Sequence, residues 1–393
     1  MRELSHRGLL LGAWVVLGLN LGLGVNVLHH FVVSSGNPVG ADFIAYWAAA
    51  KLALLGRASE IYQLASLARI EDLAQAGMSK HTAWFYPPFF LLLVLPLGAL
   101  PYLVAYPVFA GASALLFYAS LRRWLPATGF GIVILAFPGL CRNLLDGQNG
   151  LITAALAALT CWWLPRQPRL AGLSLGLLVI KPHLGLLFPL WLLQRRAWSA
   201  LTSASLCVLM LIAACTLLFG ADIWSAAGQG LANARHYLEH GIPLHRMPTV
   251  FALLRGQGVD LGQAWLAHGL VALIALLSVL RIWQLSPVLE LQVAALVAGT
   301  LLLSPYLFDY DSAWLLLAIA ALLRHVGAGR WLTGERAWLL LAWLAPLYPQ
   351  LLLIVFCDRS LQIAPLLCLA LLLLLLRRAR AEQRGAGPGS ARP

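Results

Sequence analysis

One carboxylate, Asp42, stands in the segment Gly40–Trp47, a few residues beyond the first long apolar run. An acid so close to apolar segments is costly unless it is paired or faces a polar cavity, which makes it a functional candidate by default. Such a carboxylate can act as a general base and accept the proton of a reacting group. The aromatic and proline cluster Trp84–Pro88 stiffens the chain further on. Together the two segments predict a shaped pocket at a membrane face.

Lys181 is the second candidate, because it lies midway through an otherwise apolar segment. The other two lysines, Lys51 and Lys80, fall between the first two apolar runs. Pro182 interrupts a helix at this point, so Lys181 and His183 can both turn toward an anionic group. The alternative is a lysine that extends toward the interface from the end of a span.

A third group is a basic stretch that contains Arg235, His236, Arg246 and Arg255. Clustered cations suit a phosphate, to which arginine offers forked contacts. The alternative is a solvated, mildly basic loop. A metal site is disfavoured, because only His236 and His240, which flank Glu239, have helical ligand spacing.

Two further acids, Asp309 and Asp311, follow an apolar run and could line the same cavity as Asp42. The alternative is that they cap the next helix, where an acid is favourable. The polar stretch 146–150 is interpreted as a simple turn between helices.

Composition places these residues in a polytopic membrane protein. The chain has 393 residues, of which 61% are hydrophobic and 11% charged, whereas soluble domains have about half apolar and a quarter charged residues. Continuous apolar runs rich in Leu and Ala disfavour barrel strands, in which apolar and polar residues alternate. The fold class is therefore all-α, with about 12 transmembrane helices at roughly 20 residues each. The net charge of +12 reflects arginines clustered between spans, so no nucleic acid is expected.

The expected spans leave both termini cytoplasmic, because most arginine clusters then fall inside. They lie near residues 9–32, 84–101, 103–121, 127–145, 149–164, 170–193, 197–219, 262–284, 287–306, 312–326, 338–356 and 361–376. Arg122–Arg123 and Arg166/Arg169 disobey the rule. This suggests that 84–101 and 170–193 are broken or re-entrant, an arrangement tolerated where backbone lines a cavity or is buried in protein.

One transmembrane domain, 1–380, is expected to carry the site on two long outer loops, 33–83 and 220–261. The first loop has an amphipathic pattern and is predicted to lie flat in the membrane interface. The tail 381–393 is rich in Gly, Pro, Arg and Ala and is predicted to be disordered on the cytoplasmic side. The cysteines show no disulfide or zinc spacing.

The order of these motifs resembles glycosyltransferase family 87, the GT-C-type membrane enzymes that use polyprenyl-phosphate sugars. The resemblance covers about residues 36–326 and rests on six motifs in the family's order: Asp42, Trp-x-Tyr-Pro-Pro at 84–88, Gly-Gln-Asn at 147–149, Lys181-Pro182, Met247–Phe251, and Ser304-Pro305-Tyr306 with Tyr310-Asp311. It implies transfer of mannose or a similar hexose to a glycolipid or glycan acceptor, at the outer face of the bacterial inner membrane, without a metal or other cofactor. It assigns Asp42 as the base. Asp309-Tyr310-Asp311 departs from members that carry a histidine pair here, so the sugar and acceptor do not carry over.

The residues agree with that chemistry. An acceptor hydroxyl needs a base, and a departing lipid phosphate needs cations. The candidate cations are Lys181, His183, Arg235, His236, Arg246 and Arg255. The rings of Tyr46, Trp47, Trp84 and Tyr86 are expected to stack on sugar or line the lipid groove. One displacement would invert the anomeric centre.

Two other functions are weighed against this one. A transporter or flippase of a lipid-linked sugar would also show many spans and proline-broken helices. No inverted repeat is evident, and the outer loops are unequal in length. A scaffolding subunit would not need its polar residues to converge on one face.

Overall fold

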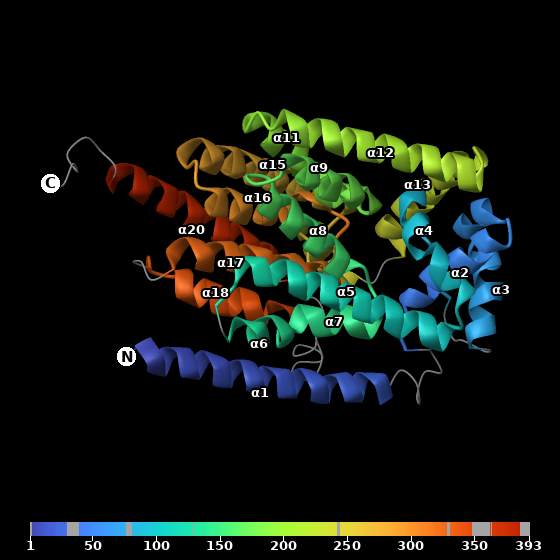
Figure 1. The fold of residues 1–393 in the computed structure, drawn as a ribbon, viewed down its shortest axis with the longest axis horizontal. Helices are drawn as coiled ribbons and strands as arrows, with labels where there is room; N and C mark the ends of the chain where they lie inside the picture. The colour runs from blue at the N-terminus through green and yellow to red at the C-terminus, as the bar shows by residue number, and fades with distance from the viewer. Residues whose placement is uncertain are drawn as a thin grey trace.

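The protein is a bundle of helices elongated along one axis (Figure 1). The computed structural model describes residues 2–29, 39–75, 81–127, 129–241, 244–327, 331–347, 362 and 364–385. Every regular element within these ranges is an α-helix or a 3-10 helix, which confirms the all-α class. Helices α2, α3, α4 and α13 gather at one end of the long axis. The start of α1 and the end of α20 lie at the other end.

Three helices among the described residues are long and apolar enough to cross a membrane: α5 (Tyr102–Trp124), α12 (Trp198–Phe219) and α15 (Leu261–Leu285). Most of their apolar side chains face outward, as expected for lipid-facing helices. Other apolar helices are shorter, for example α2 (Phe43–Leu54) and α16 (Leu289–Leu303). The expected twelve full spans are therefore not all continuous helices of spanning length.

Proline and glycine explain part of this shortening. The predicted span 84–101 is divided into α4 (Pro88–Val94) and η3 (Leu95–Ala99). The predicted span 170–193 is divided into four pieces: α9 (Pro168–Leu177), η4 (Leu178–Ile180), α10 (Pro182–Gly185) and α11 (Leu187–Gln194). The prediction that these two segments are broken is confirmed. Proline begins several pieces because it fits the first turn, where its missing N–H is not needed.

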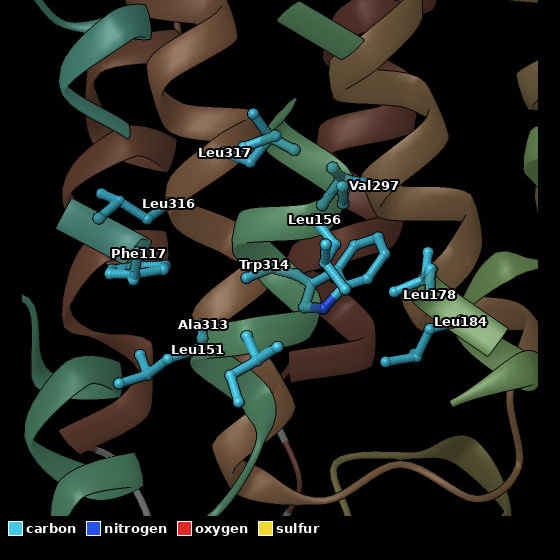
Figure 2. Packing of buried hydrophobic residues seen from close by; sticks show 14 of the residues in the cluster. Phe117, Leu151, Leu156, Leu178, Leu184, Val297, Ala313, Trp314, Leu316 and Leu317 are labelled. Carbon is cyan, nitrogen blue, oxygen red and sulfur yellow. The ribbon is translucent and has the colours of Figure 1, made fainter. Parts of the chain in front are cut away.

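The core surrounds α8 (Gly150–Trp163), α16 and α17 (Leu315–Val326), which are buried on nearly every side. A helix that is apolar all round is expected at such a place. Figure 2 shows the Trp314 ring among side chains of α8, α16 and the η4–α10 segment. Its indole Nε1 donates to Thr153 Oγ1 at 3.1 Å, which satisfies the one polar atom of the ring.

One helix of the first loop, α2, differs from the prediction. The loop forms α2, η2 (Ala58–Tyr62) and α3 (Leu64–Ala74), and α2 is packed into the core instead of lying flat in an interface. Small residues explain the difference. A Cβ added at Gly98 would come within 2.6 Å of the Ala50 carbonyl carbon, so η3 approaches the alanine-rich face of α2 very closely.

The remaining elements close the bundle. Their bounds are α1 (Arg2–His29), α6 (Phe130–Leu135), α7 (Pro138–Asp146), α13 (Asp222–His240), η5 (Leu244–Arg246), α14 (Val250–Gly256), η6 (Asp309–Trp314), α18 (Glu335–Leu344), η7 (Ala345–Leu347) and α20 (Ala364–Gly385). Helix α20 includes residues 381–385 of the tail predicted to be disordered. Residues 386–393 of that tail lie outside the described residues, as do residues 348–356, 361 and 363 of the last two predicted spans.

Candidate active site

Asp42 lies immediately before α2 and is held against the end of α7. Its backbone N–H donates to the Asp146 carbonyl at 3.0 Å. Gly40 and Gly147 permit this contact. Both have positive φ, at 73° and 70°, which favours glycine. A Cβ at Gly147 would also lie 2.5 Å from the Phe43 Cβ, so a side chain here would push the two segments apart.

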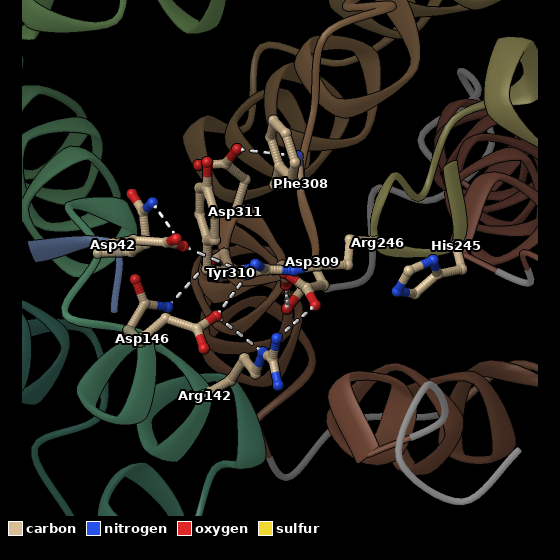
Figure 3. Close-up of polar contacts among 12 residues, drawn as sticks. Asp42, Arg142, Asp146, His245, Arg246, Phe308, Asp309, Tyr310 and Asp311 are labelled. Atoms are coloured by element: carbon tan, nitrogen blue, oxygen red, sulfur yellow. Dashed lines mark hydrogen bonds and ion pairs between the residues drawn. The ribbon is translucent and has the colours of Figure 1, made fainter. Parts of the chain in front are cut away.

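Five charged side chains meet beside this contact, and we call them the Asp42 cluster: Asp42, Arg142, Asp146, Arg246 and Asp309. Arg246 Nη2 lies 2.6 Å from Asp146 Oδ2, 3.4 Å from Asp309 Oδ1 and 3.5 Å from Asp42 Oδ2. Figure 3 shows the guanidinium of Arg246 entering between these acids from the segment that follows α13. Both long predicted outer loops thus contribute to one site.

Arg142 lies on the opposite side of the acids, on α7. Its Nε is 3.0 Å from Asp146 Oδ2, and its Nη2 is 3.1 Å from Asp309 Oδ2. The cluster therefore holds three acids against two arginines. Its side chains are between 7% and 22% exposed, so they are largely but not completely shielded from solvent.

The acids of the cluster differ in their proton affinity. Burial raises the pKa of Asp146 to about 6, although Arg142 and Arg246 oppose this effect. Burial would also raise the pKa of Asp309, but the charges of Arg246 and Arg142 outweigh it, so that this pKa is lowered. Asp309 is therefore the more firmly ionised of the two acids.

Gln148 connects the cluster to two tyrosines. Its Nε2 donates to Asp42 Oδ2 at 2.9 Å. Its Oε1 accepts from the Tyr46 hydroxyl at 2.5 Å and from the Tyr86 hydroxyl at 3.0 Å. Tyr46 and Tyr86, expected in a sugar or lipid pocket, are thus connected to Asp42 through one side chain, that of Gln148.

Trp47 and Trp84 do not reach the cluster and instead pack within the protein. Trp47 Nε1 donates to the Leu100 carbonyl, and its ring packs edge to face on Tyr102. Trp84 stacks on Phe90 and is almost fully buried. Trp84 also packs edge to face on both Tyr46 and Tyr86.

Lys181 forms a separate, closed ion pair. Its Nζ lies 2.6 Å from Asp311 Oδ1, and the two side chains are only 3% and 1% exposed. The Tyr310 ring lies 4.5 Å from the same ammonium, within cation–π range. Asp311 Oδ2 also accepts from the Phe308 backbone N–H at 3.2 Å, as a residue that caps a helix start does. Asp309 and Asp311 are two residues apart, but Asp309 belongs to the Asp42 cluster and Asp311 pairs with Lys181.

The other predicted cations lie apart from the cluster. Arg235 is 78% exposed and pairs with Glu239, four residues on along α13. The His236 ring stacks on His240, and Arg255 donates to the Val259 carbonyl. The ring of His183 meets Tyr306 edge to face, and its Nε2 is buried without a hydrogen-bond partner among the described residues. Of the six predicted phosphate ligands, Arg246 alone has a described contact with the cluster.

Sequence reasoning assigned no role to three members of the site, Arg142, Asp146 and Gln148, although Gly-Gln-Asn at 147–149 was one of the six motifs of the resemblance. The stretch 146–150 stood out as polar but was interpreted as a simple turn. Arg142 lies four residues before Asp146, so both fall on one face of α7. That pairing inside an apolar segment was the available signal.

No group of three His, Cys, Asp or Glu side chains is arranged to hold a metal ion within the part of the chain that the structure describes. The acids of the Asp42 cluster surround a guanidinium. The candidate site is therefore built from carboxylates, arginines, an amide and phenols.

Apolar helices around a charged cluster define the chain as a membrane protein with a polar site. The family model of glycosyltransferase family 87 matches residues 84–305, more than half of the chain, and the protein belongs to that family. It is therefore a glycosyltransferase. The matched region contains Arg142, Gln148 and Arg246, whereas Asp42 and Asp309 lie outside it. No curated protein and no solved structure matches the chain significantly.

Proposed function

We propose that the protein is an inverting, GT-C-type hexosyltransferase. It moves mannose or a similar sugar from a polyprenyl-phosphate donor to a glycolipid or glycan acceptor, at the extracytoplasmic face of a bacterial inner membrane. The observation that carries the proposal is the convergence of Asp42 with Arg246 in one partly exposed cluster. A base beside a phosphate-binding cation is what this transfer needs.

Asp42 serves as the base in this mechanism. Its carboxylate accepts the proton of the acceptor hydroxyl while that oxygen bonds to the anomeric carbon. The bond from this carbon to the phosphate oxygen breaks in the same displacement, and the phosphate leaves with the bonding electrons. Attack opposite the leaving group inverts the anomeric centre.

Arg246 and Arg142 stabilise the negative charge that develops on the departing phosphate. Both are largely shielded from solvent and held in place, Arg246 by Asp42 and Arg142 by Asp309, which favours electrostatic stabilisation without large reorganisation. A bound phosphate would replace some of the carboxylate contacts of Arg246. Lys181 is engaged by Asp311, so we assign it to the support of η6 instead of the donor phosphate.

Transfer assays on purified protein test this function. Radiolabelled polyprenyl-phosphate mannose and glucose are supplied with a membrane glycolipid extract, and bound donor and product are measured separately. Asp42→Asn keeps the size of the side chain but cannot accept the proton, so we expect turnover to fall by about 10²–10⁴-fold with donor binding retained. Near-native turnover in Asp42→Asn would remove Asp42 as the base.

A flippase would give a different result. It would move the labelled lipid from one leaflet of a vesicle membrane to the other without forming a glycosylated product. The configuration of the product, determined by NMR, tests inversion separately: retention of the donor configuration would contradict a single displacement.

A further inference from the structure

Gln148 occupies a position that the transfer chemistry does not by itself explain. It lies two residues beyond α7 and is 7% exposed. All polar atoms of its side chain are engaged toward Asp42 or the two tyrosines. An amide with a partner on both ends is fixed in orientation as well as in place.

The chemistry of the partners settles which end faces Asp42. An ionised carboxylate can only accept hydrogen bonds, so the group that faces it must be the amide NH₂. The amide oxygen then faces the phenols, which can both donate to it. The Tyr46 and Tyr86 hydroxyls also lie 2.7 Å from each other. Two phenols from different segments thus hold the oxygen of one amide.

The consequence falls on the two oxygens of Asp42. Gln148 Nε2 and Arg246 Nη2 both contact Oδ2. Oδ1 has no hydrogen bond among the described residues. The carboxylate is therefore held at one oxygen, and the other is left to meet a hydroxyl. Asp146 and Asp309 share Arg246 with Asp42, and Arg142 pairs with both of these acids, so Gln148 is the neutral donor among charged neighbours.

We propose that Gln148 is a positioning residue that holds the Asp42 carboxylate by Oδ2 and presents Oδ1 to the acceptor hydroxyl. Tyr46 and Tyr86 fix the amide that does this. The inference rests on the proposed role of Asp42 as the base. It adds an uncharged side chain whose hydrogen bonds connect the first loop, the segment before α4 and the end of α7.

Two substitutions test this role by kinetics. Gln148→Met removes the donor at similar length, so kcat should fall by about 10–100-fold with the KM for the lipid donor nearly unchanged, because orientation and not donor binding is lost. Gln148→Glu sets a second carboxylate beside Asp42. A like charge disfavours the ionised form that base catalysis needs, so the acid limb of the pH profile of kcat should move upward by about one pH unit or more.

Gln292→Glu is the matched control. Gln292 is also a buried glutamine, on α16, and its Oε1 accepts from Trp191 and Arg195. A new carboxylate there lies away from Asp42 and should leave the acid limb in place. Tyr86→Phe is a milder second variant that removes one phenol from the Gln148 oxygen, and it should lower kcat in the same direction by a smaller factor.

The outcomes separate this inference from the proposed function. If Asp42→Asn is inactive but the Gln148 variants and Tyr86→Phe keep wild-type kcat and acid limb, the positioning role is wrong and the base assignment stands. If Asp42→Asn is active, the base assignment itself fails. A loss in Gln148→Met that appears only in KM would also overturn the positioning role.

Discussion

Two groups of shielded charges lie in different parts of this protein and are built differently. Toward the end that holds the chain termini, Arg378 on α20 grips Glu335 on α18 with two nitrogens, at 2.6 Å and 2.5 Å. These side chains are 8% and 1% exposed. In the Asp42 cluster, one nitrogen of Arg246 is shared among three acids at distances up to 3.5 Å. Its Nε is buried without a hydrogen-bond partner among the described residues.

The difference indicates what each group is for. Arg378 and Glu335 meet through two short, parallel contacts, and Glu382 adds a third contact to Arg378 at 3.4 Å, so a further ion would gain little from this group. In the Asp42 cluster, three acids share one guanidinium nitrogen, two of these contacts are 3.4 Å or longer, and the side chains are partly exposed. An incoming phosphate can exchange with the carboxylates there. Perturbed and incompletely paired charges of this kind gather at functional sites.

Breaking the Arg378–Glu335 pair should have the largest effect on stability and the smallest effect on turnover. Glu335→Gln takes the forked partner from Arg378 and leaves it the 3.4 Å contact with Glu382, so we expect a loss of up to about 3–5 kcal/mol, the typical cost of removing one member of a buried pair. We expect a large fall in the apparent unfolding temperature in detergent. The fraction that remains folded should keep the wild-type kcat. A variant with normal stability but reduced kcat would contradict the division between the two groups.

A substitution in the Asp42 cluster should lower turnover more than stability. Arg246→Met removes the cation nearest to Asp42, and loss of one group that stabilises a developing oxyanion typically costs about 10²–10³-fold in kcat. Its unfolding temperature should change less than that of Glu335→Gln, because removal of a positive charge leaves acids that are partly exposed and can be hydrated. Transfer kinetics and thermal unfolding on the same samples check both expectations.

Arg235→Met is the matched control for that experiment. Sequence reasoning placed both arginines on the donor phosphate, but Arg235 is exposed and paired with Glu239 on its own helix. We expect the rate of transfer to stay within about twofold of wild type. Arg235 has no described contact with the Asp42 cluster, and an exposed ion pair on a helix contributes little to stability. Equal losses in the Arg235 and Arg246 variants would mean that donor binding extends over α13.

The contrast also shows what a sequence can reveal. Asp42, Arg246 and Asp309 could be singled out because charges are rare in an apolar chain, and proline correctly indicated the breaks in two helices. Their partners could not be chosen. Lys181 pairs with Asp311, 130 residues away, and no local pattern distinguishes Asp311 from Asp309 as its partner. The 3-10 turn of η6 decides this by turning the two acids in different directions.

The packing of the first loop could not be predicted from its sequence either. Its interleaved polar and apolar residues predict an amphipathic helix, whereas α2 is buried. The decision depends on Gly98, which lets a distant segment touch the backbone of Ala50. Spacing within the loop carries no information on that contact.

Glu71 offers a third arrangement, a buried acid in the first loop that accepts from the Thr82 backbone amide at 3.1 Å. Thr82 Oγ1 in turn donates to the carbonyl of Ala41, next to Asp42. Burial raises the pKa of Glu71 to about 7 from its usual 4.5. The folded protein therefore holds this proton across a range in which the unfolded chain releases it. Stability from this group is fully present below pH 4.5 and falls as the pH rises toward 7.

Glu71→Gln should remove that dependence, because the amide stays neutral and its oxygen can still accept from Thr82. We expect the variant to match wild type near pH 5 and to exceed it at pH 8, by up to about 3 kcal/mol for a pKa shift of this size. Unfolding temperatures at the two pH values measure the difference. Glu60 is the control from the same loop, since Arg57 and Ser66 lower its pKa to about 2. It stays ionised from pH 5 to 8, so Glu60→Gln should shift both values alike. If Glu71→Gln did the same, the Glu71 carboxyl would not be held protonated in the folded protein, and the tie between α3 and the Asp42 segment would not depend on pH.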